Sequence, residues 1–495
     1  MRQGKGIIGS GSIRKRYARP AMTMLQGFVL TLPLSGCFLT GKLPEPALDI
    51  PSAYRFGARN PKVAQAALPT LDWWRSFHSR ELTGIVERAR DANLDIAAAV
   101  ARVVQADAQA RITGASLLPT VDFNGNGTHA RSSQSGSSGV SFGGSEHDNL
   151  LTTLNASYEI DFWGKNRAAL KAAQEGAVAS RFDTEVVSLS TVASAANAYF
   201  QVLAAQDRLK VARENLTSAN RVLNLIKQRL NAGTASDLEV AEQESVVNGI
   251  RASIPPLQQI VTQNRNALAV LMARSPESVH IRGGSLNNIR VPRVTAGLPS
   301  ELLTQRPDIR EAEAQLAAAN ANVYNARAQF LPSITLTAEG GYESAVLKTL
   351  LRPESMLYTV AAGVTQPIFE AGRLTGNLDL QKGKQDELLQ NYRKAVISAF
   401  SDVETALESV TQTARRERLQ RDVVASSRRA FDISEQRFRE GTIDLVTVLQ
   451  TQQTLYQAQD TLVQARLAHL QAIVSLYQAL GGGWLPKPLE PRHAR

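Results

Sequence analysis

The sequence contains few of the residues on which catalytic and metal sites usually depend. It has one cysteine, Cys37, and six histidines scattered over 495 residues without metal-ligand spacing. No P-loop, no Gly-x-Ser-x-Gly and no Gly-x-Gly-x-x-Gly opening a helix occurs, and Gly125-Asn126-Gly127 is an isolated fragment. These absences argue against an enzyme, and we expect no cofactor and no metal.

The N-terminal segment, residues 1–36, is predicted to be a targeting signal. Four basic residues between positions 14 and 19 precede an apolar run at 22–34, which is shorter than the roughly 20 residues of a transmembrane helix. The sequence that ends at Cys37 resembles a bacterial lipobox, which implies cleavage before this cysteine and acylation of its thiol. Phe38 is compatible with delivery to the outer membrane. The alternative is a plain signal peptide with an incidental cysteine.

Cleavage would also change the charge of the protein. The signal carries six basic residues and no acid, so its removal lowers the formal net charge from +10 to +4. We therefore expect no nucleic-acid partner. With Cys37 acylated, no thiol remains for a disulfide. No later stretch is predicted to be long and apolar enough for a transmembrane helix.

The dominant pattern of the chain is a coiled-coil heptad. Apolar residues recur at alternating steps of four and three from Phe182 to Leu230, with one phase slip near Asp207. A turn at 231–234 separates this pattern from a second helical stretch that ends at Leu271. A helix from Lys165 to Leu230 would be roughly 100 Å long, so we expect a long antiparallel hairpin.

This hairpin is predicted to occur twice. The sequence Gln228–Thr234 returns as Gln436–Thr442, and Leu118–Thr120 returns as Leu331–Ser333. Landmarks in the same order at nearly one spacing indicate an internal tandem duplication. The expected segments are a signal peptide at 1–36, an extended tether at 37–78, a first repeat at 79–274 (strand-loop-strand 118–163, hairpin 165–273), a linker at 275–300, a second repeat at 301–480 (strand-loop-strand 331–369, hairpin 371–480) and a flexible tail at 481–495.

Two further expectations concern single helices. The apolar pattern over 80–112 predicts one helix at the start of the first repeat. Pro255-Pro256 predicts a kink or a fresh helix start, because proline inside a helix costs about 3 kcal/mol.

Short segments with period two predict strands. From Leu154 to Phe162 apolar and polar residues alternate, as they do from Val121 to Asn124, and a Gly/Ser-rich loop is expected over 125–149. Such strands suit a membrane β-barrel, but one chain offers four and small barrels start at about eight. We therefore expect several copies to share one barrel. The alternative is a soluble sheet lying against the helices.

Together these features resemble the outer-membrane factor family of TolC-like export channels, and most closely its NodT-like efflux lipoproteins. The residues that carry the resemblance are 298–303, 306–309, 366–369, 372–374 and the Gly-Thr hairpin tips. The resemblance implies a homotrimer with a twelve-stranded barrel and a periplasmic helical tunnel. It also implies a passive duct for an inner-membrane RND-type transporter and a periplasmic adaptor, with acylated Cys37 held in outer-membrane lipid.

The resemblance also assigns candidate residues to the helical tips. It implies adaptor contacts for Gly233, Thr234, Gly441 and Thr442. Acidic residues just past the tips would ring the pore, and those of this sequence are Asp237, Glu239, Glu242 and Asp444. Gln450 stands where the family often has aspartate and would give an uncharged ring. The alternative is that these acids only favour helix starts.

Three functions remain open at this stage. The first is a duct for drugs or other small molecules, paired with an RND pump. The second is a duct for an ATP-driven, type I-like protein secretion system. The third is a lipid-anchored, non-conducting helical scaffold, against which the alternating strand at 154–162 argues.

Overall fold

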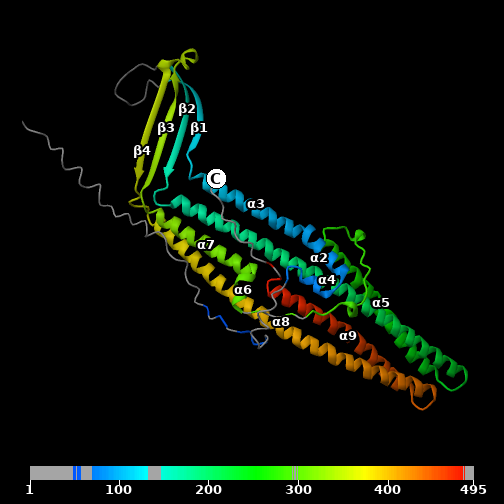
Figure 1. Cartoon of the computed structure of the whole chain (residues 1–495). Coiled ribbons are helices and arrows are strands. Elements are labelled where there is room, and N and C mark those ends of the chain that lie inside the picture. The colour runs from blue at the N-terminus through cyan, green and yellow to red at the C-terminus, as the bar shows by residue number, and fades with distance from the viewer. Residues whose placement is uncertain are drawn as a thin grey trace, which may run out of the picture. The chain divides into compact units, whose positions relative to one another are not determined.

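The computed structural model describes residues 48, 50, 51, 53–56, 70–131, 146–292, 294, 297, 299–482 and 484. The expected signal at 1–36, Cys37 and most of the tail lie outside these residues. Over the described ranges the chain consists of long helices and a four-stranded antiparallel sheet (Figure 1). The mainly helical fold with four strands is confirmed.

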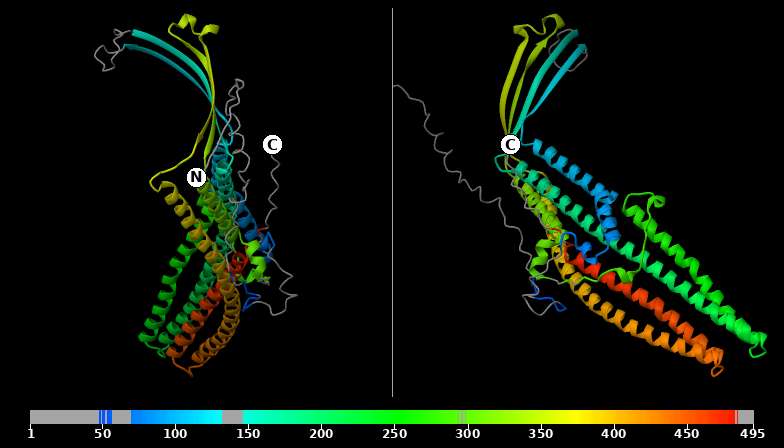
Figure 2. Two further views of the ribbon diagram at one scale, coloured as in Figure 1. Left: turned by 90° about the vertical axis from the view of Figure 1, so that its left-hand side faces the viewer. Right: turned by 45° about the vertical axis from the view of Figure 1, so that its right-hand side comes forward.

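Two helical hairpins of equal size dominate the structure. Helices α4 (Lys165–Asn231) and α8 (Arg373–Arg439) each have 67 residues, and α5 (Asp237–Leu271) and α9 (Leu445–Ala479) each have 35. Each boundary in the second hairpin lies 208 positions after its counterpart in the first. Both views in Figure 2 show α5 beside α4 and α9 beside α8. At 1.5 Å per residue, α4 and α8 are each about 100 Å long.

The elements before each hairpin repeat as well. Helices α3 (Leu94–Ala115) and α7 (Pro307–Ala328) both have 22 residues, and strands β1 (Thr120–Arg131) and β3 (Ser333–Ser344) both have 12. Here the second copy follows the first by 213 positions. The tandem duplication seen in the sequence is therefore present element by element in the structure.

The sheet joins the two repeats. Its order is β1-β2-β3-β4, with β2 (Glu146–Ile160) and β4 (Met356–Thr365) completing it, and every pair is antiparallel. The central pair, β2 with β3, connects the first repeat to the second. The loop expected over 125–149 is shorter than predicted, because residues 125–131 and 146–149 are paired in strands. Backbone hydrogen bonds hold these residues in the ladder although their side chains are polar.

The single helix expected over 80–112 is wrong. The structure has α2 (Arg80–Ala92) and α3, separated at Asn93. The Asn93 side-chain oxygen accepts hydrogen bonds from the backbone N–H groups of Asp95 and Ile96, which caps α3. Its amide nitrogen donates to the carbonyl of Leu271 at 3.0 Å, so the break also fastens α3 to the end of α5.

Of the two alternatives expected at Pro255-Pro256, a kink or a fresh helix start, the fresh start is wrong. Helix α5 continues through both prolines from Asp237 to Leu271. Each proline removes one backbone donor, but Val247 and Leu257 on either side are buried. Packing against α4 therefore holds the helix together across the missing hydrogen bonds.

The tether was expected to extend over residues 37–78, but its C-terminal end belongs to the core. The short helix η2 (Trp73–Phe77) buries three aromatic side chains, and the Trp73 ring stacks on Tyr477 of α9 with centroids 4.8 Å apart. Earlier in the tether, Tyr54 packs against α8, and the Arg55 N–H donates to Glu404 at 2.5 Å. The extended form predicted up to residue 78 therefore ends before Trp73.

The linker between the repeats is clamped to both hairpins. It contains η3 (Pro276–Ser278) and η4 (Leu286–Asn288) and leads into α6 (Pro299–Gln305). Asp207 of α4 accepts hydrogen bonds from the Leu286 N–H at 2.9 Å and the Ser285 hydroxyl at 3.1 Å. Arg466 of α9 donates to the carbonyl of Ile289 at 2.7 Å. Burial raises the pKa of the Asp207 carboxyl despite these hydrogen bonds.

Helix α4 contains a stretch that is long and apolar enough, by length and composition, to span a membrane. The expectation that no such stretch follows the signal is therefore wrong. Within the described structure 56% of that stretch is buried, and α4 packs against α2, α3, α5, α7 and α9. The core position of α4 accounts for its apolar composition.

A buried ionic cluster joins α8 to α9 near the linker. The Glu417 carboxylate is 4% exposed and accepts hydrogen bonds from His469 Nδ1 at 2.6 Å, from Arg466 at 3.0 Å and from Arg421. Burial favours the protonated acid, but the His469 hydrogen bond and the two guanidinium charges outweigh it. They hold the pKa of Glu417 below its usual value.

We predict that Glu417→Ala destabilises the fold by about 3 kcal/mol or more, because it leaves Arg466 buried without its carboxylate partner. The measurement is denaturant unfolding in detergent, with Glu387→Ala, an exposed glutamate of the same helix, as the control. Since the folded pKa of Glu417 is depressed, its contribution is complete above the unfolded value of about 4.3. That contribution disappears as the pH falls through the lower folded value. Equal stability of the two variants at pH 7 would contradict the assignment.

Candidate functional site

One face of the sheet is apolar and exposed. Along each strand alternate residues point to this face, and they lie opposite one another in the register, as Phe123 lies opposite Leu154. The large exposed residues on this face are Val121, Phe123, Leu154, Leu336, Met356, Tyr358, Val360 and Val364. An exposed apolar area of this extent marks a membrane or protein contact.

The other face of the sheet is polar. Its residues include Asp122, Asn124, Asn155, Thr335, Thr337 and Glu339. Among the described strand residues only Thr153 is buried, so no described element packs across either face as it would in a soluble sheet. The strands are 10 to 15 residues long, and the sheet has one apolar and one polar face. These are the features of membrane β-barrel strands, which face lipid on one side and an aqueous pore on the other.

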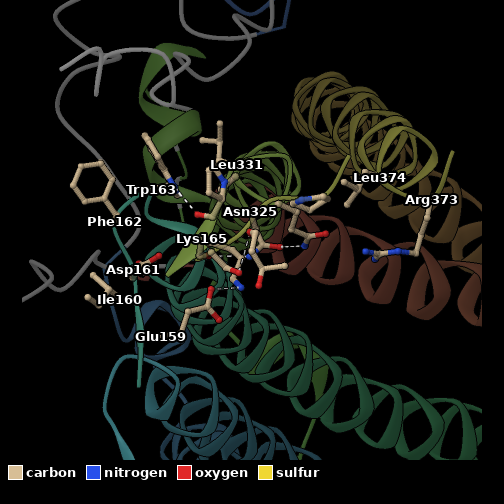
Figure 3. A pocket seen from close by; sticks show the side chains of 16 residues that line it. Glu159, Ile160, Asp161, Phe162, Trp163, Lys165, Asn325, Leu331, Arg373 and Leu374 are labelled. Carbon is tan, nitrogen blue, oxygen red and sulfur yellow. Dashed lines mark hydrogen bonds and ion pairs between the residues drawn. The ribbon is translucent and has the colours of Figure 1, made fainter. Parts of the chain in front are cut away.

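The junction between sheet and helices holds a cavity of about 350 Å³ (Figure 3). Polar contacts fix the elements around it: Lys165 at the start of α4 pairs with Glu159 of β2, and the Trp163 ring N–H donates to the carbonyl of Pro332 at 2.8 Å. The Asn325 side chain of α7 donates to the carbonyl of Lys165 at 2.8 Å. These contacts join the first repeat to the second and set the direction in which the strands leave the helices.

Both helical tips are closed by the same turn. Gly233 and Gly441 have φ of 73°, which favours glycine, and each follows the last residues of a long helix. The N–H of Thr234 bonds to the carbonyl of Arg229 at 2.8 Å, and that of Thr442 bonds to Arg437 at 3.0 Å. Each threonine hydroxyl donates to the same carbonyl at 3.1 Å. The Gly-Thr pair is thus explained by helix termination at both tips.

The two tips are packed together, a contact that the sequence did not predict. The Arg229 guanidinium donates to the carbonyl of Phe438 at 3.2 Å and lies 4.7 Å from the centre of its ring. Beneath it Ile226 shares a buried apolar cluster with Val448 and other residues of the second hairpin. The only signal in the sequence was the repeated Gln-Arg-Leu and Gln-Arg-Phe before each turn.

Two of the candidate pore acids cap helices. Glu239 and Ser236 form a capping box at the start of α5, with the Ser236 N–H donating to the Glu239 carboxylate at 2.7 Å. Asp444 is the N-cap of α9 and accepts from the Thr447 hydroxyl at 2.6 Å and its N–H at 2.9 Å. These two hydrogen bonds lower the pKa of Asp444. The helix-start interpretation therefore accounts for both residues.

The other candidates lie on the same two helices. Asp237 is the exposed first residue of α5, Glu242 is half-buried one turn further on, and Gln450 is exposed on α9. In the part of the chain that the structure describes, no group of three or more His, Cys, Asp or Glu residues could hold a metal ion. The tips thus combine tight turns, helix caps and exposed carboxylates.

The amphipathic sheet and the paired long hairpins define a channel-forming protein of the bacterial envelope. Residues 85–274 and 298–482 match the outer membrane efflux protein family. The chain belongs to this family, and it is an outer-membrane channel that extends into the periplasm.

Relatives and solved structures agree with this assignment over almost the whole chain. The pyoverdine export outer membrane protein OpmQ of Pseudomonas aeruginosa is 41% identical over 465 residues, covering 91% of this chain and 96% of the relative. The toluene efflux pump outer membrane protein TtgC of Pseudomonas putida is 32% identical, covering 93% and 96%. The Campylobacter jejuni CmeC outer membrane channel superposes with a TM-score of 0.84 at 27% identity, covering 90% of this chain and 95% of that one.

We predict that Asp444→Ala increases amide hydrogen exchange severalfold in the first turn of α9, because the Thr447 N–H loses its acceptor. Asp444→Asn is the matched control, since asparagine caps as well as aspartate does. Because the folded pKa of Asp444 is depressed, its charged-cap contribution is complete above about 3.9 and is lost as the pH falls through the lower folded value. Unchanged exchange in the alanine variant would exclude a capping role.

Proposed function

We propose that this chain is the passive duct of a tripartite efflux system, which carries small molecules from an inner-membrane RND-type transporter and a periplasmic adaptor to the outside. The observation that carries the proposal is a sheet with one exposed apolar face that is directly continuous with two helices of about 100 Å. Four strands are too few for a closed barrel, so the proposed unit is a homotrimer with twelve strands.

The proposed cargo class is small organic molecules, with pyoverdine as the first candidate. The relatives reported above are named for pyoverdine export and toluene efflux, and the first of them is 41% identical. These names support small-molecule export over the alternative of an ATP-driven protein secretion duct. The exposed apolar strand face favours a duct over the third alternative, a non-conducting scaffold.

Two finer assignments belong to this proposal. Cys37 is the proposed lipid attachment site in the outer membrane, supported by the lipobox-like sequence before it. Gly233, Thr234, Gly441 and Thr442 are the proposed adaptor contacts, supported by their position at the exposed ends of both hairpins.

The proposed gate lies just behind the tips. Asp237 and Asp444 occupy equivalent ends of α5 and α9, and three copies of each would place six carboxylates around one constriction. Glu239 and Glu242 would add to this ring, and Gln450 would provide polar but uncharged groups. Capping and pore lining are compatible, because a cap occupies one carboxylate oxygen with backbone donors and leaves the charge in place.

The experiment that tests the duct is accumulation of toluene, fluorescent drugs and pyoverdine in cells that lack this chain but keep the partner pump. We expect each true cargo to accumulate on deletion and to fall to the original level when the chain is restored. Unchanged accumulation of every compound, with an altered secreted proteome, would establish the protein-secretion alternative instead.

A Cys37→Ala chain in the same assay should assemble but restore export only in part, because its anchor is lost. Full restoration with normal membrane fractionation would show that the anchor is dispensable.

For the gate, we predict that Asp237→Asn with Asp444→Asn lowers the cation preference of the channel in planar bilayers. The asparagine at 444 keeps the α9 cap, so the helices stay intact while the charge is removed. The matched control is Glu277→Gln, which removes an exposed carboxylate from η3 in the linker, away from the tips and from the polar face of the sheet. An unaltered reversal potential in a salt gradient would remove both aspartates from the gate.

A further inference from the structure

The loop between β3 and β4 exposes large apolar side chains at the end of the sheet that lies away from the helices (Figure 1). Val346, Leu347 and Leu351 are 57%, 74% and 77% exposed. The helices at the other end of the sheet extend into the periplasm, so this loop lies on the outer side of the membrane. A group of exposed apolar side chains marks a contact with a partner.

Hydrogen bonds within the loop hold it in an ordered form. It contains two short helices, η5 (Leu347–Thr349) and η6 (Pro353–Ser355). The Ser355 hydroxyl donates to the carbonyl of Thr349 at 2.8 Å, which joins η6 to η5. The Thr349 hydroxyl lies 2.7 Å from that of Ser344, which joins η5 to the end of β3. The exposed apolar side chains therefore belong to a fixed surface.

Ser344 shows on which side of the sheet this surface lies. It is separated from Leu336 by an even number of positions along β3, so its side chain points to the apolar face. The Ser344 hydroxyl donates to the carbonyl of Val346 at 3.0 Å and contacts Thr349. Since these contacts are made from the apolar face, the start of the loop lies on the lipid side of the sheet and not over the pore.

The apolar face of β4 alone does not reach across the membrane. Met356 and Val364 are the exposed apolar residues nearest its two ends, and they are eight positions apart. At about 3.4 Å per residue and a tilt of about 40°, they span roughly 20 Å of depth, whereas the apolar band of such barrels is about 25 Å tall. The loop that precedes Met356 therefore lies at the outer edge of this band, within reach of lipid acyl chains.

Each exposed leucine of the loop is followed directly by an exposed basic residue. Lys348 follows Leu347, and Arg352 follows Leu351. Neither basic side chain has a carboxylate partner in the part of the chain that the structure describes. The loop also contains one acid, Glu354, and has a net charge of +1. Basic groups at the edge of an apolar surface favour an anionic lipid headgroup.

The neighbouring strands treat their charges differently. His129 Nδ1 of β1 lies 2.6 Å from the Asp148 carboxylate of β2, and Arg131 pairs with Glu146 at 3.4 Å. All four residues are on the same face as Phe123, further out than its apolar residues. These charged groups have partners within the sheet, whereas those of the β3–β4 loop are left available for a ligand.

We infer that the β3–β4 loop is a binding site for a phosphorylated lipid of the outer leaflet. The acyl chains lie against the three exposed apolar side chains, and Lys348 and Arg352 hold a phosphate group through charge-assisted hydrogen bonds. The aliphatic stems of both basic residues can lie along the apolar surface while their charged ends reach the headgroup. The inference rests on the outer-membrane location and not on the proposed transport function.

The phosphate contact is tested by native mass spectrometry of the full-length protein in a neutral detergent. The probe is lipid A, a diphosphorylated glucosamine lipid of the outer leaflet. We expect Lys348→Gln with Arg352→Gln to weaken lipid A binding about tenfold or more, because two charged contacts are lost. The matched control is Arg251→Gln with Arg274→Gln, which removes the same charge from exposed positions in the helical part. Lipid A without its phosphates should bind the native chain and the loop variant equally.

The acyl contact is tested with a second pair of substitutions. Leu347→Ser with Leu351→Ser should weaken the binding of lipid A and of its dephosphorylated form alike, about tenfold, because apolar contact area is lost. Leu238→Ser with Val270→Ser is the matched control, since both residues are exposed apolar residues of α5. Inorganic phosphate should leave lipid A bound. Displacement by phosphate alone would reassign the basic residues to a free-phosphate site and overturn the lipid assignment.

The remaining outcomes also decide the question. Equal lipid A affinity of the native chain and both loop variants would overturn the inference, as would equal losses in the control variants. Unchanged lipid binding by the leucine variant with a smaller oligomer would assign the leucines to a contact between copies. Unchanged lipid binding with altered channel conductance would assign them to the pore mouth, and either result contradicts the lipid site. Because binding is measured without transport, failure of the proposed duct would leave this site standing.

The substituted side chains are exposed, so we expect all variants to unfold at the same temperature as the native chain.

Discussion

The structure depends on the requirement that every backbone N–H and C=O group in the membrane be hydrogen-bonded. A sheet of four strands leaves two edges, and those of β1 and β4 have no partner among the described residues. This is tolerable only if copies of the chain satisfy each other's edges. The incompleteness of the single chain is therefore a consequence of its membrane location.

The duplication explains how one chain can meet this requirement with contact surfaces of a single geometry. A contact surface between the repeats already has to exist within the chain, from the β2–β3 pair down to Arg229 and Phe438 at the tips. A ring of copies needs a second surface of the same geometry. Both hairpins have helices of 67 and 35 residues. Because these lengths are equal, the strands of the two repeats are aligned at one end and the two tips are aligned at the other. The hydrogen bonds that join the linker to Asp207 of α4 and to Arg466 of α9 fix the position of the two repeats relative to each other along the helix axes.

The long helices, their turns and the duplication were predictable because their signals are periodic and local. A heptad gives the hairpin, and Gly-Thr after a long helix gives the turn at Gly233 and Gly441. The errors arose where tertiary contacts decide. Asn93 breaks a continuous helical pattern because its side chain caps α3 and binds Leu271, and Pro255-Pro256 fails to break α5 because α4 supports it. The ends of β1 and β2 were missed because pairing extends beyond the alternating segment.

For the candidate site residues, sequence reasoning placed acidic side chains beside the two helical turns but could not assign their roles. Glu239 and Asp444 are acidic, stand at helix starts and lie near the tips, and each property suits both a cap and a pore ring. The geometry separates the two roles only in part, since a capping carboxylate keeps its charge. In the proposed gate, Asp444 would couple charge to structure, because protonation of this capping carboxylate would weaken the start of α9 and also lower the charge at the constriction. Asp237 is not the N-cap of α5, so within the proposed gate it is the aspartate whose charge can be removed without loss of a cap.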